Sequence, residues 1–234
     1  MPTRMLTVDG LTFDVRESTR HRTIEIVVER DGSLVLATPR DTPAEALTRF
    51  VQENLVWVHA RLLEKEAQAP PHTPREFVSG EGLYYLGRKY RLAIVDGVQG
   101  QPPLRLHQSR FELRRDAIPQ ARERFLHWYT LHLRPVLDRQ IAALAPRIEA
   151  RPREVHIQDL GYRWGSSNRR GHLYFHWRVA MLPRSAIEYL VAHELVHLVE
   201  RNHGDAFWTR LARVLPDHAD RQRWLKEHGA MYDL

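Results

Sequence analysis

The sequence predicts an α+β protein in which a β-rich N-terminal subdomain, residues 1–115, precedes a mixed subdomain, residues 116–234. Two observations support this class. Short β-rich runs bounded by turn residues dominate the first part, whereas apolar residues at helical spacing dominate the second. In the second subdomain we expect the helix that begins at Pro183 to pack beside a small sheet. The 234 residues are ample for a sizeable core.

The N-terminal subdomain is expected to contain hairpins and one helix. The run TIEIVVERDGSLVLATPR holds two β-rich segments around Asp31-Gly32, a dipeptide that favours a hairpin turn. Residues 42–68 then change to helical spacing. After a Pro-rich connector, the runs GLYYLGRKYRLAIV and PLRLHQSRFELRR each predict a further pair of strands.

The C-terminal subdomain is expected to begin with a long helix from about Ile118. An extended run, EVHIQDL, a loop, GYRWGSSNRRG, and an alternating run, HLYFHWRV, follow it. We expect residues 172–179 to form one strand, with Leu173, Phe175, Trp177 and Val179 on one face and His172, Tyr174, His176 and Arg178 on the other. Pro183 is expected to begin the next helix, and two helical segments are expected near 205–214 and 217–228.

Composition excludes several classes of protein. The chain has no cysteine, so disulfides, cysteine-ligated zinc and a cysteine nucleophile are excluded. It also lacks the long apolar run of a membrane span and the basic and apolar regions of a signal peptide, so a cytoplasmic location is expected. The net charge is +6, and arginines are scattered along the chain. Scatter favours a compositional bias of the source genome over an anionic partner such as nucleic acid.

The stretch HELVHLVERNH, residues 193–203, carries the clearest chemical signal. Successive helical residues turn by about 100°, so His193 and His197 lie about 40° apart and can bind the same ion. Glu194 lies next to them and can act on a water molecule without binding the metal. This is the HExxH arrangement of two zinc ligands and a general base, which predicts a zincin-like subdomain. The alternative is an amphipathic helix with two incidental histidines.

A catalytic zinc ion usually has a third protein ligand, and His203 is the nearest candidate. On a continuous helix His203 would point about 240° away from His197. The helix must therefore end before His203, and Asn202, in the left-handed conformation, with Gly204 is expected to end it. Two alternatives remain: His203 only lies at a helix C-terminus, or Glu200 is the ligand. We expect Glu200 to be an exposed charge.

The segment YRWGSSNRRGHLYFHWRVAMLPRSAIEYLVAHELVHLVERNHGDAFWTRL resembles the YgjP-like, or WLM-type, predicted zinc metallopeptidases, a SprT-like group related to minigluzincins. The shared pattern is an Arg-Trp-Gly-Ser segment, a Trp-Arg strand, HExxH, Asn-His and Phe-Trp. The chain matches it at Arg163, Trp164, Gly165, Ser166, Trp177, Arg178, His193, Glu194, His197, Asn202, His203, Phe207 and Trp208. The N-terminal half also resembles the family, so the resemblance covers nearly the whole chain.

The resemblance implies a hydrolase with one zinc ion per chain, held by His193, His197 and His203, with Glu194 as general base. It favours a metallopeptidase. The first alternative is a metal-dependent nucleotide pyrophosphatase, an activity attributed to a relative. The second is a module that binds nucleic acid or protein around a structural metal, but a purely structural site has no use for Glu194.

Three further side chains are candidates for substrate binding. If the run HLYFHWRV is an edge strand, it can pair with an extended peptide and project His176 or Arg178 toward the cleft. Arg163 could bind a substrate carboxylate or stabilise an oxyanion. The alternatives are a solvated strand face and a structural hydrogen bond. The chain departs from the family at Ser167, where Cys is usual, and at His176, where Asn is frequent. Four aromatic residues are expected in the core rather than on a substrate platform: Trp164, Trp177, Phe207 and Trp208.

Overall fold

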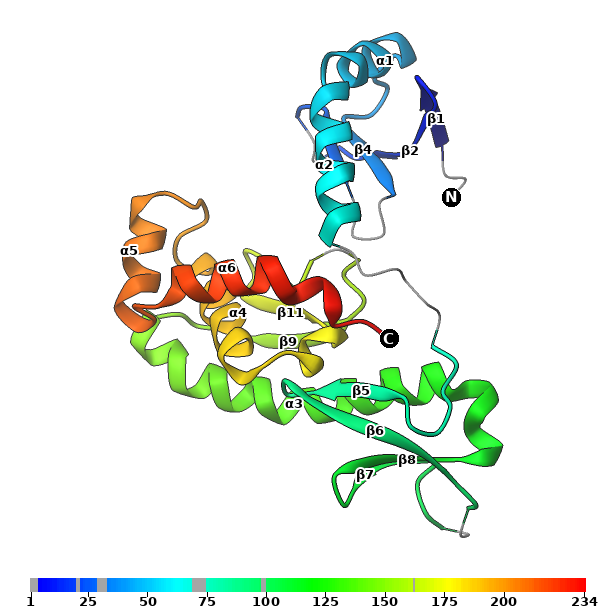
Figure 1. The fold of residues 1–234 in the computed structure, drawn as a ribbon. Coiled ribbons are helices and arrows are strands. Elements are labelled where there is room, and N and C mark those ends of the chain that lie inside the picture. The colour runs from blue at the N-terminus through cyan, green and yellow to red at the C-terminus, as the bar shows by residue number, and fades with distance from the viewer. Residues whose placement is uncertain (1–3, 20–21, 29–32, 69–74, 98–99, 162) are drawn as a thin grey trace. The chain divides into compact units, whose positions relative to one another are not determined.

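The computed structural model confirms the α+β class. It describes residues 4–19, 22–28, 33–97 without 69–74, 100–161 and 163–234, with the backbone alone for residues 63–68. The chain divides into two compact units, Met1–His72 and Thr73–Leu234 (Figure 1).

The first unit is a four-stranded sheet followed by two helices. Its elements are β1 (Arg4–Val8), β2 (Leu11–Glu17), β3 (Glu25–Val28), β4 (Leu34–Thr38), α1 (Ala44–Glu53) and α2 (Leu55–Gln68). The strand order is β1-β2-β4-β3, with β2 and β4 parallel. The predicted pairing of β3 with β4 is confirmed, although the expected turn at Asp31-Gly32 lies outside the described residues.

The single helix expected over residues 42–68 is in fact two helices. The break falls at Asn54, whose side-chain amide donates to the Phe50 carbonyl at 2.8 Å and whose backbone N–H donates to Val51 at 3.0 Å. Asparagine commonly satisfies backbone groups in this way where a helix ends. The resulting bend lets Val51 of α1 and Val58 of α2 pack in the same core.

The second unit begins with a sheet that has the same connectivity as the first. Its strands are β5 (Gly82–Tyr85), β6 (Arg88–Val95), β7 (Leu104–His107) and β8 (Arg110–Arg114), in the order β5-β6-β8-β7. Both predicted hairpins are confirmed. Their turns, Leu86-Gly87 and Gln108-Ser109, have positive φ at both central residues, as type I′ hairpin turns require.

This second sheet belongs with the C-terminal helices, so the structure divides the chain at His72–Thr73 and not at the predicted boundary after residue 115. The turn between β5 and β6 explains why. Leu86 donates its backbone N–H to Ala180 at 2.8 Å and Gly87 donates to Met181 at 2.9 Å. A Cβ on Gly87 would lie 2.9 Å from the Pro183 Cα, so the turn packs directly against the start of the helix that begins at Arg184.

The remainder of the second unit holds a three-stranded sheet among helices. Its elements are α3 (Ala121–Ile148), β9 (Glu154–Gln158), β10 (Gly165–Ser167), β11 (His172–His176), α4 (Arg184–His197), α5 (Asp205–Val214) and α6 (His218–His228), with 3₁₀ turns at Arg115–Gln120, Trp177–Met181 and Gly229–Met231. The strand order is β10-β11-β9. The long helix, the helix after Pro183 and the two final helices were all expected, within a few residues.

The strand expected over residues 172–179 is shorter than predicted and lies elsewhere in its sheet. It ends at His176, and Trp177–Met181 forms a 3₁₀ turn. Trp177 and Val179 are still buried, together with Ala180 and Met181 of the same turn. β11 also lies between β9 and β10, so the expectation that this run is an edge strand is wrong.

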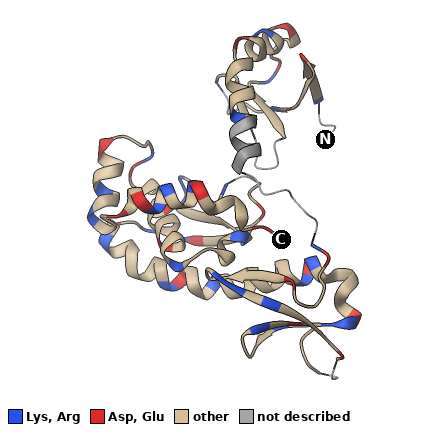
Figure 2. Ribbon diagram, viewed as in Figure 1, with Lys and Arg blue, Asp and Glu red and all other residues tan. Residues whose placement is uncertain are grey.

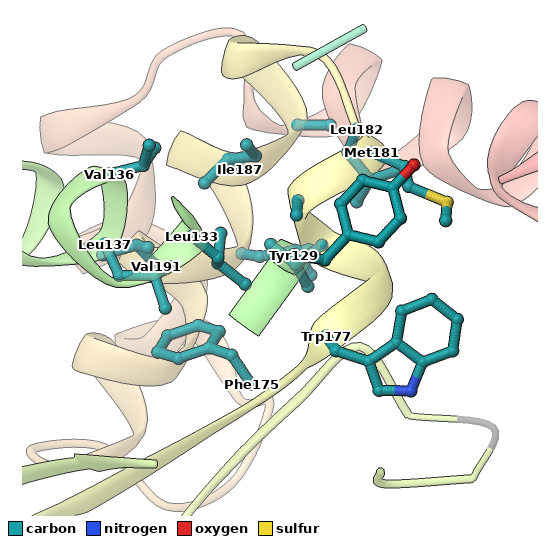
Figure 3. Packing of buried hydrophobic residues seen from close by; sticks show 14 of the residues in the cluster. Tyr129, Leu133, Val136, Leu137, Phe175, Trp177, Met181, Leu182, Ile187 and Val191 are labelled. Carbon is teal, nitrogen blue, oxygen red and sulfur yellow. The ribbon is translucent and has the colours of Figure 1, made fainter. Parts of the chain in front are cut away.

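Helix α4 packs against the long helix α3. Leu133 and Leu137 of α3 lie close to Phe175 of β11 and Val191 of α4 (Figure 3). Burial of each such side chain contributes about 1.5–3 kcal/mol. The Tyr129 hydroxyl donates to a β5 carbonyl at 2.8 Å, which ties α3 to the neighbouring sheet. The helix that carries the HExxH residues is therefore held on a rigid, close-packed base.

Candidate metal centre

Three histidine side chains converge at the C-terminal end of α4. The Nε2 atom of His197 lies 3.1 Å from Nε2 of His193 and 3.1 Å from Nε2 of His203, and the third separation is 3.2 Å. The structure thus brings together the three histidines that the sequence singled out.

The course of the chain after α4 explains how His203 reaches the cluster. The helix ends at His197, followed by Leu198 in the right-handed helical conformation. The prediction of a helix end before His203 is therefore confirmed. The prediction that Asn202 and Gly204 end the helix is wrong, since neither is among the described residues with positive φ. The chain instead leaves the helix five residues earlier and has more length in which to turn back.

The three ring nitrogens fit a shared cation better than they fit one another. Each Nε2 can carry at most one hydrogen, so three of them cannot all be satisfied by mutual hydrogen bonds. Two imidazole nitrogens bound to one tetrahedral zinc ion, at about 2.0–2.1 Å each, are about 3.3 Å apart. Burial, followed by the charges of His197 and His203, lowers the pKa of His193 to about 3, so the ring stays neutral, the form that binds metal.

The surroundings orient the histidine rings. Nδ1 of His197 lies 3.2 Å from the carbonyl oxygen of Glu200, a contact that turns Nε2 toward the cluster. The Phe207 ring lies 4.6–5.0 Å from all three imidazole rings, measured between centroids. Trp208 donates its indole N–H to the His203 carbonyl at 3.0 Å. The Phe-Trp pair therefore supports the cluster from α5.

The aromatic residues lie where the sequence predicted. Phe207 and Trp177 are buried in the core, and Trp164 and Trp208 are partly buried against the same core. The Glu200 carboxylate, expected to be an exposed charge, is 32% exposed and pairs with Arg210 at 3.6 Å. The group of potential ligands found there among the described residues consists of histidines alone.

Glu194 is a buried carboxylate beside the cluster, with 5% of its surface exposed. Burial raises its pKa to about 7, although a hydrogen bond from Ser167 and the positive charge of Arg163 both act in the opposite direction. A carboxylate with a pKa near neutrality can both accept and release a proton, which is what a general base and acid must do. Arg163 is thus close enough to Glu194 for its positive charge to lower the pKa of that carboxyl group.

His176 and Arg178 are engaged elsewhere. His176 is 1% exposed; its Nδ1 accepts the backbone N–H of Arg178 at 3.1 Å and its Nε2 lies 3.2 Å from Asp159. Arg178 forms an ion pair with Asp233 at 2.9 Å. Because β11 ends at His176, the two residues do not share a strand face. The expectation that they lie on one strand face is therefore wrong, and a role for His176 or Arg178 in substrate binding stays a prediction.

Gly165 and Ser167, in the segment WGSS, both contact the Glu194 side chain, which the sequence did not predict. A Cβ on Gly165 would lie 2.8 Å from Oε1 of Glu194, so a larger residue at this position of β10 would force the Glu194 side chain to move. Ser167 donates its hydroxyl hydrogen bond to the same carboxylate. A glycine within a strand often marks such a close approach, and this was the available signal.

The sequence pattern of a known family matches most of this chain. The family described as YgjP-like, metallopeptidase domain, matches residues 22–228, which include the three clustered histidines and Glu194. The chain belongs to the YgjP-like metallopeptidase family. This YgjP-like domain spans both structural units, so the first unit is part of the family pattern.

Other comparisons add little to this assignment. One solved structure, the crystal structure of the metallopeptidase zymogen of Pyrococcus abyssi abylysin, covers 38% of the YgjP-like chain and 91% of its own, with 22% identity and a TM-score of 0.35. At that distance the likeness carries no argument. No curated protein matches the chain. In the part of the chain that the structure describes, no helix has both the length and the apolarity needed to cross a membrane.

Proposed function

We propose that this YgjP-like protein is a zinc-dependent peptidase, with His193, His197 and His203 as the zinc ligands and Glu194 as the general base. One observation carries the proposal. The carboxylate of Glu194, which is buried and has a pKa of about 7, adjoins a cluster of three imidazole rings. A structural metal site needs no such carboxylate and usually closes its fourth position with a protein ligand.

Each residue has a separate task in the proposed reaction. Bound zinc would supply Lewis acidity to the substrate carbonyl and would acidify water. Glu194 takes a proton from the attacking water and returns it to the leaving amine. Ser167 holds the Glu194 carboxylate in place through its hydrogen bond. The positive charge of Arg163 favours negative charge that develops in the same region.

Strand β10 supports a peptide as the substrate. In the order β10-β11-β9 it is a terminal strand of its described sheet, so its outer edge can pair with an extended chain. Gly165 and Ser167 of β10 both lie against Glu194. A peptide added to this edge would therefore present its backbone carbonyls next to the base. In this proposal β10 takes the role that the sequence suggested for residues 172–179.

The distribution of charge gives less support to a nucleic-acid partner. Lys and Arg are spread over the helices and strands of both units, interspersed with Asp and Glu (Figure 2). Many arginines are ion-paired within the chain; Arg105 and Arg110, for example, lie 2.7 Å and 3.0 Å from Glu112. Binding to nucleic acid is thus expected to be weak and strongly dependent on salt.

The proposal is tested by incubating the zinc-loaded chain with a peptide library and a nucleotide panel in parallel. We expect peptide cleavage by the wild-type chain and at least about 100-fold slower cleavage by Glu194→Gln. Hydrolysis of nucleotides without cleavage of peptides would replace the proposal by the pyrophosphatase alternative. Tight DNA binding at physiological salt, with no hydrolysis of either panel, would instead favour the binding module.

Removal of the Ser167 hydroxyl is expected to slow the reaction without loss of zinc. Ser167→Ala should lower kcat by about 5-fold, because one hydrogen bond contributes about 1 kcal/mol. Ser166→Ala is the matched control, since the neighbouring side chain lies on the opposite face of β10. Steady-state kinetics and zinc content of both variants give the answer. Equal effects of the two changes would contradict the assigned role of Ser167.

A further inference from the structure

A second group of potential metal ligands lies on the three-stranded sheet, away from α4. It consists of Glu154 and His156 on β9 and His172 on β11. β9 and β11 are parallel, and His172 is the register partner of Glu154. Glu154 and His156 are two residues apart on one strand, so all three side chains project from the same face of the sheet.

That face is the one opposite the candidate zinc centre. Ser167, which contacts Glu194, is the register partner of Leu173, whose side chain is buried in the core. Because successive side chains alternate between faces, His172 points to the other side of the sheet from Leu173. The second group is therefore separate from the three histidines of α4 and its neighbouring turn.

The donor atoms of this group converge on one point. The Oε2 atom of Glu154 lies 3.0 Å from Nε2 of His156 and 3.5 Å from Nδ1 of His172. The His156 ring stacks on Tyr174, with 4.9 Å between centroids and 17° between planes. The Tyr174 hydroxyl in turn accepts a hydrogen bond from Asn168 at 3.2 Å. The His156 imidazole is thus held by a neighbour that is itself anchored.

We propose that Glu154, His156 and His172 form a second metal site, which binds a divalent transition-metal ion such as zinc. Two imidazoles and a carboxylate suit zinc, copper or nickel, whereas magnesium and calcium prefer oxygen ligands throughout. The two donor separations, 3.0 Å and 3.5 Å, bracket the value of about 3.3 Å expected for ligands of one tetrahedral ion. The inference does not depend on the proposed peptidase activity.

The exposure of the three side chains suits an ion that exchanges with solvent. Glu154 is 57% exposed, His156 39% and His172 22%. Water can therefore fill the remaining coordination positions, and binding should be weaker than at the cluster of His193, His197 and His203, which offers three imidazole ligands. An ion at this site would also link β9 to β11. Since it binds only the folded chain, it should raise the thermal midpoint of unfolding.

Zinc titration of the full-length chain, with the first equivalent already bound, tests the site. We expect a second equivalent to bind in the wild-type chain. Its affinity should fall by at least about 10-fold, or about 1.4 kcal/mol, in His172→Gln and in Glu154→Gln. Glu154 is exposed and His172 is partly exposed, and the retained first equivalent reports that each variant is folded.

His107→Gln provides the matched control for this titration. His107 is also a partly exposed histidine beside a carboxylate, with Nδ1 3.6 Å from Glu112, but it belongs to no group of three potential ligands among the described residues. Its variant should bind the second equivalent as the wild-type chain does. The proposal is overturned if no second equivalent binds, if both variants of the site retain it, or if His107→Gln loses it equally.

Discussion

Replacement of Glu194 by Gln is expected to lower kcat for peptide hydrolysis by at least about 100-fold, the lower end of what a general base contributes. Glutamine keeps the size and shape of the side chain but cannot accept a proton from water. Zinc should remain bound, because the three imidazoles, and not Glu194, form the ligand cluster. Kinetics and zinc content measured on the same preparation separate these two effects.

Glu200→Gln is the control for this experiment. Glu200 lies in the turn after α4, and its carboxylate pairs with Arg210 rather than with a histidine ring. We expect near wild-type kcat and full zinc content for this variant. If Glu194→Gln lost its zinc, Glu194 would be a ligand and the assignment of the base would fail. An active Glu194→Gln protein would refute the mechanism directly.

Substitution of His203 by Ala is expected to weaken zinc binding by more than about 100-fold, above the 10–100-fold that loss of an outer-shell partner costs. The reason is geometric: Nε2 of His203 lies 3.1 Å and 3.2 Å from the Nε2 atoms of His197 and His193. Glu200→Ala should change the affinity little, because the substitution keeps the backbone carbonyl that contacts His197. Competition with a chromogenic chelator measures both constants.

The ranking of these two variants is decisive. A greater loss in Glu200→Ala than in His203→Ala would identify a carboxylate ligand, and the ion pair with Arg210 would then have to open on metal binding. Equal and small losses would mean that His193 and His197 hold the ion without a third protein ligand. Either result would reject the three-histidine centre.

The relation between His193, His197 and Glu194 could be predicted from the sequence because it is local. The spacing of residues along one helix sets their angular positions, whatever the rest of the chain does. The hairpins at Leu86-Gly87 and Gln108-Ser109 were predictable for the same reason, since each depends on a few adjacent residues. The prediction of His203 as third ligand was also a local argument, because on a continuous helix its side chain would point away from His193 and His197.

Contacts between distant segments decided everything else about the site. Gly165 and Ser167 lie against Glu194 only because β10 packs on α4. The order β10-β11-β9 makes β11 a central strand, and no periodicity within residues 172–179 reports which strands will flank it.

The division of the chain was likewise a matter of tertiary structure. The β-rich composition of residues 73–115 is equally compatible with the first core and with the second. The docking of Leu86 and Gly87 onto the segment before α4 assigns this sheet to the second unit. Sequence spacing thus determined which side chains share one helix face. Pairing and packing between segments far apart in the chain determined which strand edge, and which hydroxyl group, lie beside the Glu194 carboxylate.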